Sequence, residues 1–169
     1  MALFLSTTIN KMDSKSRVSV PSNFRNSLQK QSFKGLIAFP SYKHPSIDAC
    51  GIDRMERISE NLDNNNDYTQ DEFDLISLYF GEAEQIPFDK DGRIVVPKKL
   101  IQHALIENEI LFVGLGPTFQ MWNPEKYQNK KKLTIKIAGE KKLNPRLKPI
   151  PKGLWLRRNY DTSSKNAIT

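Results

Sequence analysis

The sequence predicts a β-rich α+β fold built from two tandem copies of one small unit, and three observations lead to this prediction. Two stretches, DSKSRVSVP at residues 13–21 and DKDGRIVVP at residues 89–97, lie 76 positions apart (89 minus 13). Each is followed by apolar residues at helical spacing and then by a short apolar run typical of a strand. Because self-similarity at a fixed offset indicates a repeated structural unit, we predict the order turn, strand, helix, strand in each copy.

Residues at equivalent positions of the two copies agree in identity or character. The matching pairs are Asp13 and Asp89, Arg17 and Arg93, Val18 and Ile94, Val20 and Val96, Pro21 and Pro97, and Phe24 and Leu100. Each proline stands where a helix can start, because a first-turn residue needs no backbone N–H donor. The apolar runs at 36–39 and 110–113 predict strands, and the runs at 49–52 and 118–122 predict return strands that end each copy in a hairpin.

The size of each copy indicates how the copies must pack. The chain has 169 residues with 38% hydrophobic content, but one copy of roughly 45 residues is too small to bury a stable core alone. We therefore expect the two copies to share a core and the protein to form a homo-oligomer.

Two helices are predicted between the copies. Asp53 with Glu56, and Thr69 with Glu72, have the spacing of helix N-terminal caps ahead of apolar residues three and four apart, and Gly81 is a plausible stop. The resulting division is a first repeat at 5–52, linking helices at 53–81, a second repeat at 82–125 and a C-terminal segment at 126–169.

The net charge of +7 is unevenly distributed. Residues 1–123 hold 13 Lys and Arg against 16 Asp and Glu, whereas residues 124–169 hold 13 against 3. We expect the C-terminal segment, which is basic and contains prolines, to be largely disordered. Its alternating residues 133–137 permit one extra strand.

Several classes of function lack candidate residues. Cys50 is the single cysteine, so no intrachain disulfide is expected, and no paired Cys and His spacing indicates a metal site. His44 and His103 lie outside the repeat and have no nucleophile partner in the pattern, so we expect neither an enzyme nor a cofactor nor a small-molecule substrate. The apolar start of the chain, residues 1–5, is too short for a signal peptide or a membrane span, which predicts a cytoplasmic protein with no membrane partner.

The repeated Asp and Arg suggest a binding function. A carboxylate four residues before an arginine can orient the guanidinium through a local ion pair or a backbone bond. An arginine held in this way suits phosphate and the guanine edge in the major groove. Lysines flank both arginines, namely Lys11, Lys15, Lys90, Lys98 and Lys99. The alternative is that each Asp and Arg pair only stabilises its turn. The residues alone favour the two interpretations about equally.

The chain resembles the MraZ family of bacterial transcriptional regulators, which are built from two SpoVT/AbrB-type units. The resemblance covers about residues 1–126 and rests on the two motif copies, on their order around the linking helices, and on Gly114, Gly116, Phe119 and Trp122. It implies a pseudo-twofold swapped-hairpin β-barrel made of two βαβ-type repeats. It also implies a cytoplasmic, nucleoid-associated protein that assembles as a ring on repeated sites in double-stranded DNA near its own promoter, and that represses or otherwise tunes the cell-division and cell-wall gene cluster.

The family motif, Asp-x-x-Gly-Arg, assigns roles to residues of both loops. Arg17 and Arg93 become the leading DNA contacts, with Lys15 as a neighbour and Lys11 and Lys90 as further cations, and the loops are organised by Asp13, Asp89 and Gly92. The first copy departs from the motif because Ser16 replaces the glycine. If that position needs a positive φ, serine costs roughly 1 kcal/mol or more and the loop is expected to differ in shape.

A second interpretation belongs to a different class of protein. The same repeats could assemble a structural or interaction ring, with the basic C-terminal segment binding nucleic acid or acidic partners nonspecifically. Removal of that segment would then abolish DNA binding.

Overall fold

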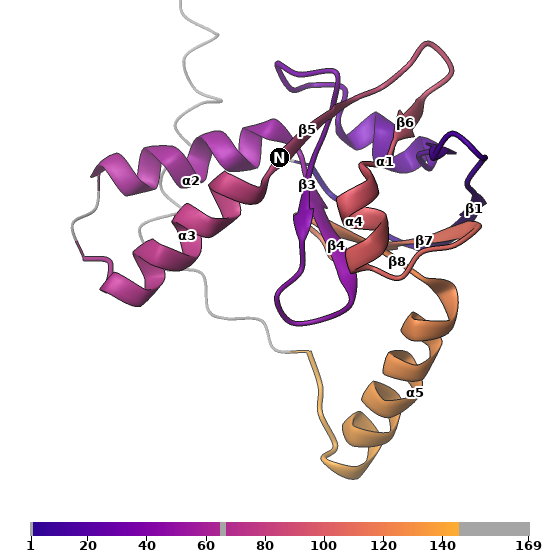
Figure 1. Ribbon diagram of the computed structural model, residues 1–169. Helices are drawn as coiled ribbons and strands as arrows, with labels where there is room; N and C mark the ends of the chain where they lie inside the picture. Colours follow the sequence, from indigo (N-terminus) through magenta and orange to yellow (C-terminus); the bar gives the residue numbers. More distant parts are fainter. Residues whose placement is uncertain (1, 65–66, 146–169) are drawn as a thin grey trace, which may run out of the picture. The chain divides into compact units, whose positions relative to one another are not determined.

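The structure of the protein is a computed structural model that describes residues 2–64 and 67–145. It is an α+β fold rich in antiparallel strands, as the sequence predicts (Figure 1). The chain divides into two units, residues 1–132 and residues 133–169. Both copies of the repeat belong to the first unit.

The two copies have the same order of elements. The first contains β1 Thr7–Lys11, β2 Arg17–Ser19, α1 Ser22–Ser27, β3 Gly35–Pro40 and β4 Ser46–Cys50. The second contains β5 Glu84–Pro87, β6 Arg93–Val95, α4 Lys98–His103, β7 Glu109–Gly114 and β8 Phe119–Trp122. The predicted strand, helix and hairpin are present in each copy. The structure adds the leading strands β1 and β5 to this prediction. Their sequence pattern does not reveal them, because both segments are short and half-exposed.

Strand pairing interleaves the two copies. The larger sheet has the order β1-β7-β8-β4-β3-β5, in which every pair is antiparallel. Strand β1 of the first copy pairs with β7 of the second, and β5 of the second copy pairs with β3 of the first. Strands β4 and β8 join the two hairpins at the centre. Neither copy therefore has a sheet of its own.

The smaller sheet consists of β2 and β6 and carries the repeated motif. Val18 pairs with Ile94, its equivalent at the offset of 76, so the pairing is centred on equivalent residues. Arg17 lies opposite Val95 and Arg93 lies opposite Ser19. The register is therefore symmetric about the pair Val18 and Ile94, although Arg17 lies opposite a valine and Arg93 opposite a serine.

One hydrophobic core joins the copies, as their size predicts. Phe24 of α1 makes ring contacts with Phe4, Phe112 and Phe119, whose centroids lie 5.4, 6.3 and 5.0 Å away. The cluster takes equivalent residues from both copies, including Val18, Val20, Phe24, Ile94, Val96 and Leu100. Burial of these side chains is the main favourable term in folding, so the copies are expected to fold together.

The short helices start at the prolines. Pro21 is the N-cap residue of α1 and Pro97 is the N-cap residue of α4. Phe24 and Leu100, at the same place in each helix, are fully buried. This confirms the predicted helices.

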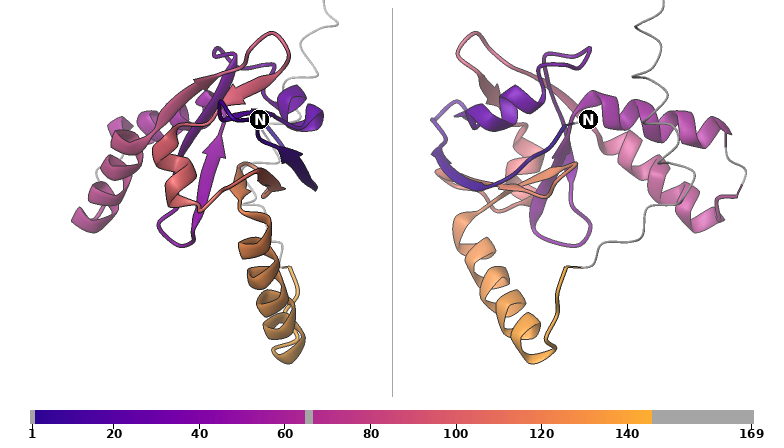
Figure 2. Two further views of the ribbon diagram at one scale, coloured as in Figure 1. Left: turned by 45° about the vertical axis from the view of Figure 1, so that its right-hand side comes forward. Right: turned by 180° about the vertical axis from the view of Figure 1, so that it is seen from behind.

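Helices α2 Ile52–Asn64 and α3 Gln70–Glu82 link the copies and lie side by side in Figure 1 and in the right-hand view of Figure 2. The capping box at Thr69 and Glu72 is confirmed, with Glu72 N donating to Thr69 Oγ1 at 3.3 Å and Thr69 N donating to Glu72 Oε2 at 2.8 Å. Asp53 lies in the first turn of α2 and is not its cap, because the helix begins at Ile52, whose N–H donates to Gln31 Oε1 at 2.8 Å. Gly81 lies inside α3, which ends one residue later.

Part of the C-terminal segment, for which the sequence predicts a largely disordered tail, is helical. Residues Pro124–Glu140 form α5, so the strand considered at 133–137 is wrong. The helix starts because Asn123 Oδ1 accepts from Glu125 N at 2.9 Å and from Lys126 N at 3.3 Å, and because proline suits the first turn. Tyr127 packs on Trp122 with ring centroids 5.6 Å apart. Residues 146–169 of the predicted tail lie outside the described residues.

The single cysteine and the two histidines pack against other parts of the fold. Cys50 is buried, and this burial raises the pKa of its thiol to about 12. His103 Nε2 donates to the carbonyl oxygen of Ser41 at 2.9 Å, and His44 packs on the Trp122 ring. Both histidines help to hold the β3–β4 connection.

Candidate nucleic-acid interface

The first motif loop, residues 13–17, is organised by one carboxylate. Asp13 Oδ1 accepts from the backbone N–H of Lys15 and of Arg17, both at 2.9 Å. Asp13 Oδ2 accepts from Arg17 Nε at 2.7 Å. The carboxylate therefore fixes the turn and the direction of the guanidinium together, which is the orienting role that the sequence predicts.

The second motif loop, residues 89–93, repeats this arrangement and adds one contact. Asp89 Oδ1 accepts from Asp91 N and Arg93 N at 2.9 Å, and Asp89 Oδ2 accepts from Arg93 Nε at 2.8 Å. In addition, Arg93 Nη2 donates to Asp91 Oδ2 at 3.0 Å. Lys15 stands at the position equivalent to Asp91 (91 minus 76), so the first loop lacks this second carboxylate.

The residue before each arginine has a left-handed backbone in both loops. Its φ is 60° at Ser16 and 73° at Gly92. The Ser16 N–H donates to the Asp13 carbonyl at 3.0 Å, and the Gly92 N–H donates to the Asp89 carbonyl at 3.1 Å. The expectation of a differently shaped first loop is therefore wrong: serine adopts the glycine conformation, at a cost of roughly 1 kcal/mol.

The β2–β6 pair holds the two loops together. The Val20 N–H donates to the Gly92 carbonyl at 3.2 Å, and the Val96 N–H donates to the Ser16 carbonyl at 2.9 Å. Val18 and Ile94 point into the core and are 1% exposed. Because side chains alternate along a strand, Arg17 and Arg93 lie on the opposite, solvent-facing side of the same two-stranded ribbon.

Electrostatics keep these ion pairs charged. Hydrogen bonding from the Arg17 backbone N–H is the largest cause that lowers the pKa of Asp13, and the Arg93 backbone N–H does the same for the pKa of Asp89. The hydrogen bond to Asp89 raises the pKa of Arg93. The arginine side chains remain 36% (Arg17) and 32% (Arg93) exposed, so their outer edges are accessible to a ligand.

The lysines predicted near the arginines differ in what surrounds them. Lys15 and Lys90 are exposed within the loops, and Lys11 is exposed at the end of β1, opposite Glu109 of β7. Lys99 is instead engaged with Glu84 at 2.7 Å and with Glu82 at 3.8 Å, which neutralises its charge. The locally positive character of the ribbon thus depends on the loop residues themselves.

One cation beside the second loop was missed by the sequence reading. Arg25 of α1, in the first copy, lies against Gly92 so closely that a Cβ at residue 92 would overlap its guanidinium. Its buried Nε has no hydrogen-bond partner in the described part of the chain. Only the interleaving of the copies brings residue 25 to residue 92, so no local pattern could have indicated this neighbour.

The two loops are suited to binding an anion, because each presents an oriented guanidinium on the exposed ribbon. Within residues 2–64 and 67–145, no group of three or more His, Cys, Asp and Glu is placed to hold a metal ion. Nor does any helix in that part of the chain have the length and apolarity needed to cross a membrane. Two carboxylate-oriented guanidiniums on one exposed ribbon remain as the clearest binding feature.

Comparisons with known proteins agree on one family. Residues 79–141 match the family model described as "MraZ protein, putative antitoxin-like". The protein named "Transcriptional regulator MraZ" from Rickettsia akari (strain Hartford) is 40% identical over 146 residues, covering 86% of this chain and 98% of that protein. Its namesake from Rickettsia bellii (strain OSU 85-389) is 40% identical over 147 residues, with the same coverage. The match extends from the repeats into α5.

Proposed function

Because this chain belongs to the MraZ family of transcriptional regulators, we propose that it binds double-stranded DNA through the loops at 13–17 and 89–93. The observation that carries the proposal is the pair of carboxylate-oriented arginines, Arg17 and Arg93, on one face of the β2–β6 ribbon. Arginine presents a planar fork that matches phosphate oxygens and the O6 and N7 atoms of guanine. Lys11, Lys15 and Lys90 add sequence-independent attraction to the backbone, and Asp13, Asp89 and Gly92 shape the loops.

The oligomer we propose is a ring of subunits, each a pseudo-twofold swapped-hairpin β-barrel. The exchanged pairings of β1 with β7 and of β5 with β3 support the swapped arrangement. Helix α3 has no buried residue, yet it exposes Phe73, Leu75 and Leu78 by 52%, 45% and 44%, which is typical of a surface that another protein covers. In a ring, weak contacts from several loop pairs to tandem sites would add through multivalency.

The targets we propose are repeated sites near the protein's own promoter, in the cell-division and cell-wall gene cluster. Binding there would repress that cluster and place the protein in the cytoplasm on the nucleoid. Regulation in this scheme needs neither a cofactor nor catalysis.

The alternative function, an interaction ring with a nonspecific basic segment, is favoured by the charge distribution. Residues 124–169 carry a net charge of +10 (13 minus 3), while the rest of the chain is net negative. Nonspecific phosphate binding by such a segment would be strongly dependent on salt.

A binding titration separates the two functions. Full-length protein and a version ending at residue 145, which keeps α5 and removes six Lys and Arg with one Asp, would be titrated with DNA from upstream of the gene and with a scrambled duplex, at matched salt. Preference of the shorter protein for the native duplex is the expected result. Equal binding of both duplexes, weakened on truncation, would instead support the interaction ring.

A further inference from the structure

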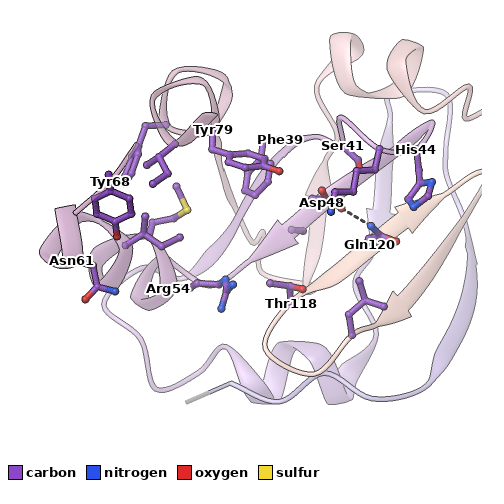
Figure 3. Close-up of a pocket in the computed structure, with 17 residues that line it drawn as sticks. Phe39, Ser41, His44, Asp48, Arg54, Asn61, Tyr68, Tyr79, Thr118 and Gln120 are labelled. Carbon is purple, nitrogen blue, oxygen red and sulfur yellow. Dashed lines mark hydrogen bonds between the residues drawn. The ribbon is translucent and has the colours of Figure 1, made fainter. Parts of the chain in front are cut away.

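A cavity of about 580 Å³ lies within the first unit, between the helical pair and the sheet and apart from the motif loops (Figure 3). Helix α2 contributes Arg54, Met55 and Ile58, and α3 contributes Ile76 and Tyr79. The sheet side is formed by residues of β3, β4 and β8. The volume is in the range of sites that enclose small organic molecules, which is about 300–1,000 Å³.

One wall of the cavity is aromatic. Phe39 and Tyr79 pack edge to face with ring centroids 4.9 Å apart, and Tyr42 extends the group on Tyr79 at 5.4 Å. Figure 3 shows Tyr68 on the same side as Tyr79, across from the sheet. Ring edges and faces of this kind favour a flat, aromatic ligand, since aromatic pairs gain energy beyond their buried area.

The lining of the cavity holds two cations, Arg54 and Lys43, and neither forms an ion pair within the described residues. The Arg54 guanidinium, on a half-buried residue, points toward the space between α2 and the sheet (Figure 3), and within the described ranges it has neither an ion pair nor a side-chain hydrogen bond. The acidic group opposite, Asp48, already accepts from Gln120 Nε2 at 2.6 Å, and Gln120 Oε1 accepts from Trp122 Nε1 at 2.9 Å. Asp48 therefore has one carboxylate oxygen engaged with Gln120, and within the described residues no ion pair joins it to Arg54.

The other ionisable groups of the lining also favour an anionic ligand. Lys43 adds a second positive charge at the exposed β3–β4 turn. Burial is the main cause that lowers the pKa of His44, so this imidazole is neutral at pH 7. With Asp48 as the single carboxylate among the lining residues, the lining has a net charge of +1.

From this geometry we propose that the cavity is a binding site for a small aromatic carboxylate. Its ring would lie along the wall formed by Phe39 and Tyr79, and its carboxylate would bind the fork of Arg54. The site would be a property of the repeat scaffold that is separate from the DNA-binding loops. It stands independently of the proposed function.

The test is calorimetric titration of the full-length protein with 2-naphthoate and with its neutral analogue 2-naphthalenemethanol. We expect saturable 1:1 binding of 2-naphthoate and weaker binding of the neutral analogue. Arg54→Gln should weaken 2-naphthoate binding by about 10-fold or more, the usual effect of losing a charge-assisted hydrogen bond, without changing the affinity for the neutral analogue. Arg57→Gln, one turn along α2 on an exposed residue, is the matched control and should bind as the wild type does.

Two results would overturn the proposal. One is equal loss of 2-naphthoate affinity in the Arg54 and Arg57 variants, and the other is no binding by the wild type at all, as expected if a neighbouring copy fills the cavity. Arg54→Lys keeps the charge and loses the planar fork, so the proposal predicts an intermediate affinity for 2-naphthoate. This variant replaces Arg54→Gln in the test if the glutamine variant does not fold. DNA titration of the same samples reports on the proposed function separately, because Arg54 lies outside both loops.

Discussion

The two motif loops have nearly the same backbone hydrogen bonds and differ in sequence at three positions. In both, an aspartate accepts two backbone N–H groups and an arginine Nε, with distances that agree within 0.1 Å. The first loop has Ser14, Lys15 and Ser16 where the second has Lys90, Asp91 and Gly92. Counting the charged side chains of each loop gives a net charge of +1 for residues 13–17 and zero for residues 89–93.

This comparison separates what shapes the loop from what the loop can bind. The Asp and Arg pair imposes the same turn on both loops. Ser16 has a φ of 60° and makes the same backbone hydrogen bond to the aspartate carbonyl as Gly92 does. The charge available to a ligand depends on the position of Lys15 and Asp91, since Asp91 accepts from Arg93 Nη2, whereas neither Nη group of Arg17 has a hydrogen-bond partner within the described residues. The loop that departs from the family motif therefore has the less neutralised arginine.

The largest effect is expected from removing the arginines. Arg17→Ala and Arg93→Ala should each weaken specific DNA binding by roughly 10- to 100-fold, with the larger loss at Arg17 because its guanidinium faces one carboxylate instead of two. Competition titration at fixed salt measures the loss, and sedimentation should show unchanged assembly. Arg57→Ala serves as the control on an exposed face, and affinities like the wild type in both loop variants would contradict the assignment.

Exchanging the residue before each arginine should affect stability unequally. Gly92→Ser should lower the free energy of unfolding by about 1 kcal/mol or more. A residue with a Cβ is strained at this positive φ, and the added Cβ also displaces Arg25. Ser16→Gly should change it little, since relief of strain is offset by the greater freedom of glycine in the unfolded chain. Urea denaturation monitored by circular dichroism tests both. Changes of equal size and opposite sign in the two variants would show that φ alone determines the free energy of unfolding at this position.

Exchanging the variable charge should change the salt dependence. Asp91→Lys places a lysine at the position equivalent to Lys15 and frees Arg93 Nη2, so we expect the slope of log affinity against log salt to steepen by about 0.9 for each phosphate gained. Lys15→Asp should make it shallower. A slope unaffected by either change would mean that these positions do not face the nucleic acid.

The smallest effect concerns acid stability. Both aspartates have a lowered pKa in the folded protein, mainly through backbone hydrogen bonds from the arginines. Their stabilising contribution is therefore complete above the pKa of the unfolded aspartate, about 3.9, and is lost as the pH falls through the lower folded values. Asp13→Asn and Asp89→Asn should flatten the decline in urea midpoint between pH 5 and pH 3, and a decline parallel to the wild type would contradict this account.

Local sequence patterns predicted the elements whose causes are local. The turn, strand and helix around Pro21 and Pro97 follow from residues a few positions apart, and the Thr69 and Glu72 box is a contact within one turn. The error at residues 133–137 has the same origin. Alternating apolar residues are typical of a strand, but the cap at Asn123 and the packing of Tyr127 on Trp122 begin a helix that continues through them.

The amino-acid sequence by itself determined the repeat, the orienting role of Asp13 and Asp89, and the positions of Arg17 and Arg93, because these depend on spacing along one chain. Only the tertiary structure decided that β1 pairs with β7 and β5 with β3, that Arg25 lies on Gly92, and that Arg54 faces an aromatic wall. These contacts join residues far apart in the chain. They form because neither copy can bury its apolar face alone, so the pairing between copies is selected by the shared core instead of by any local pattern.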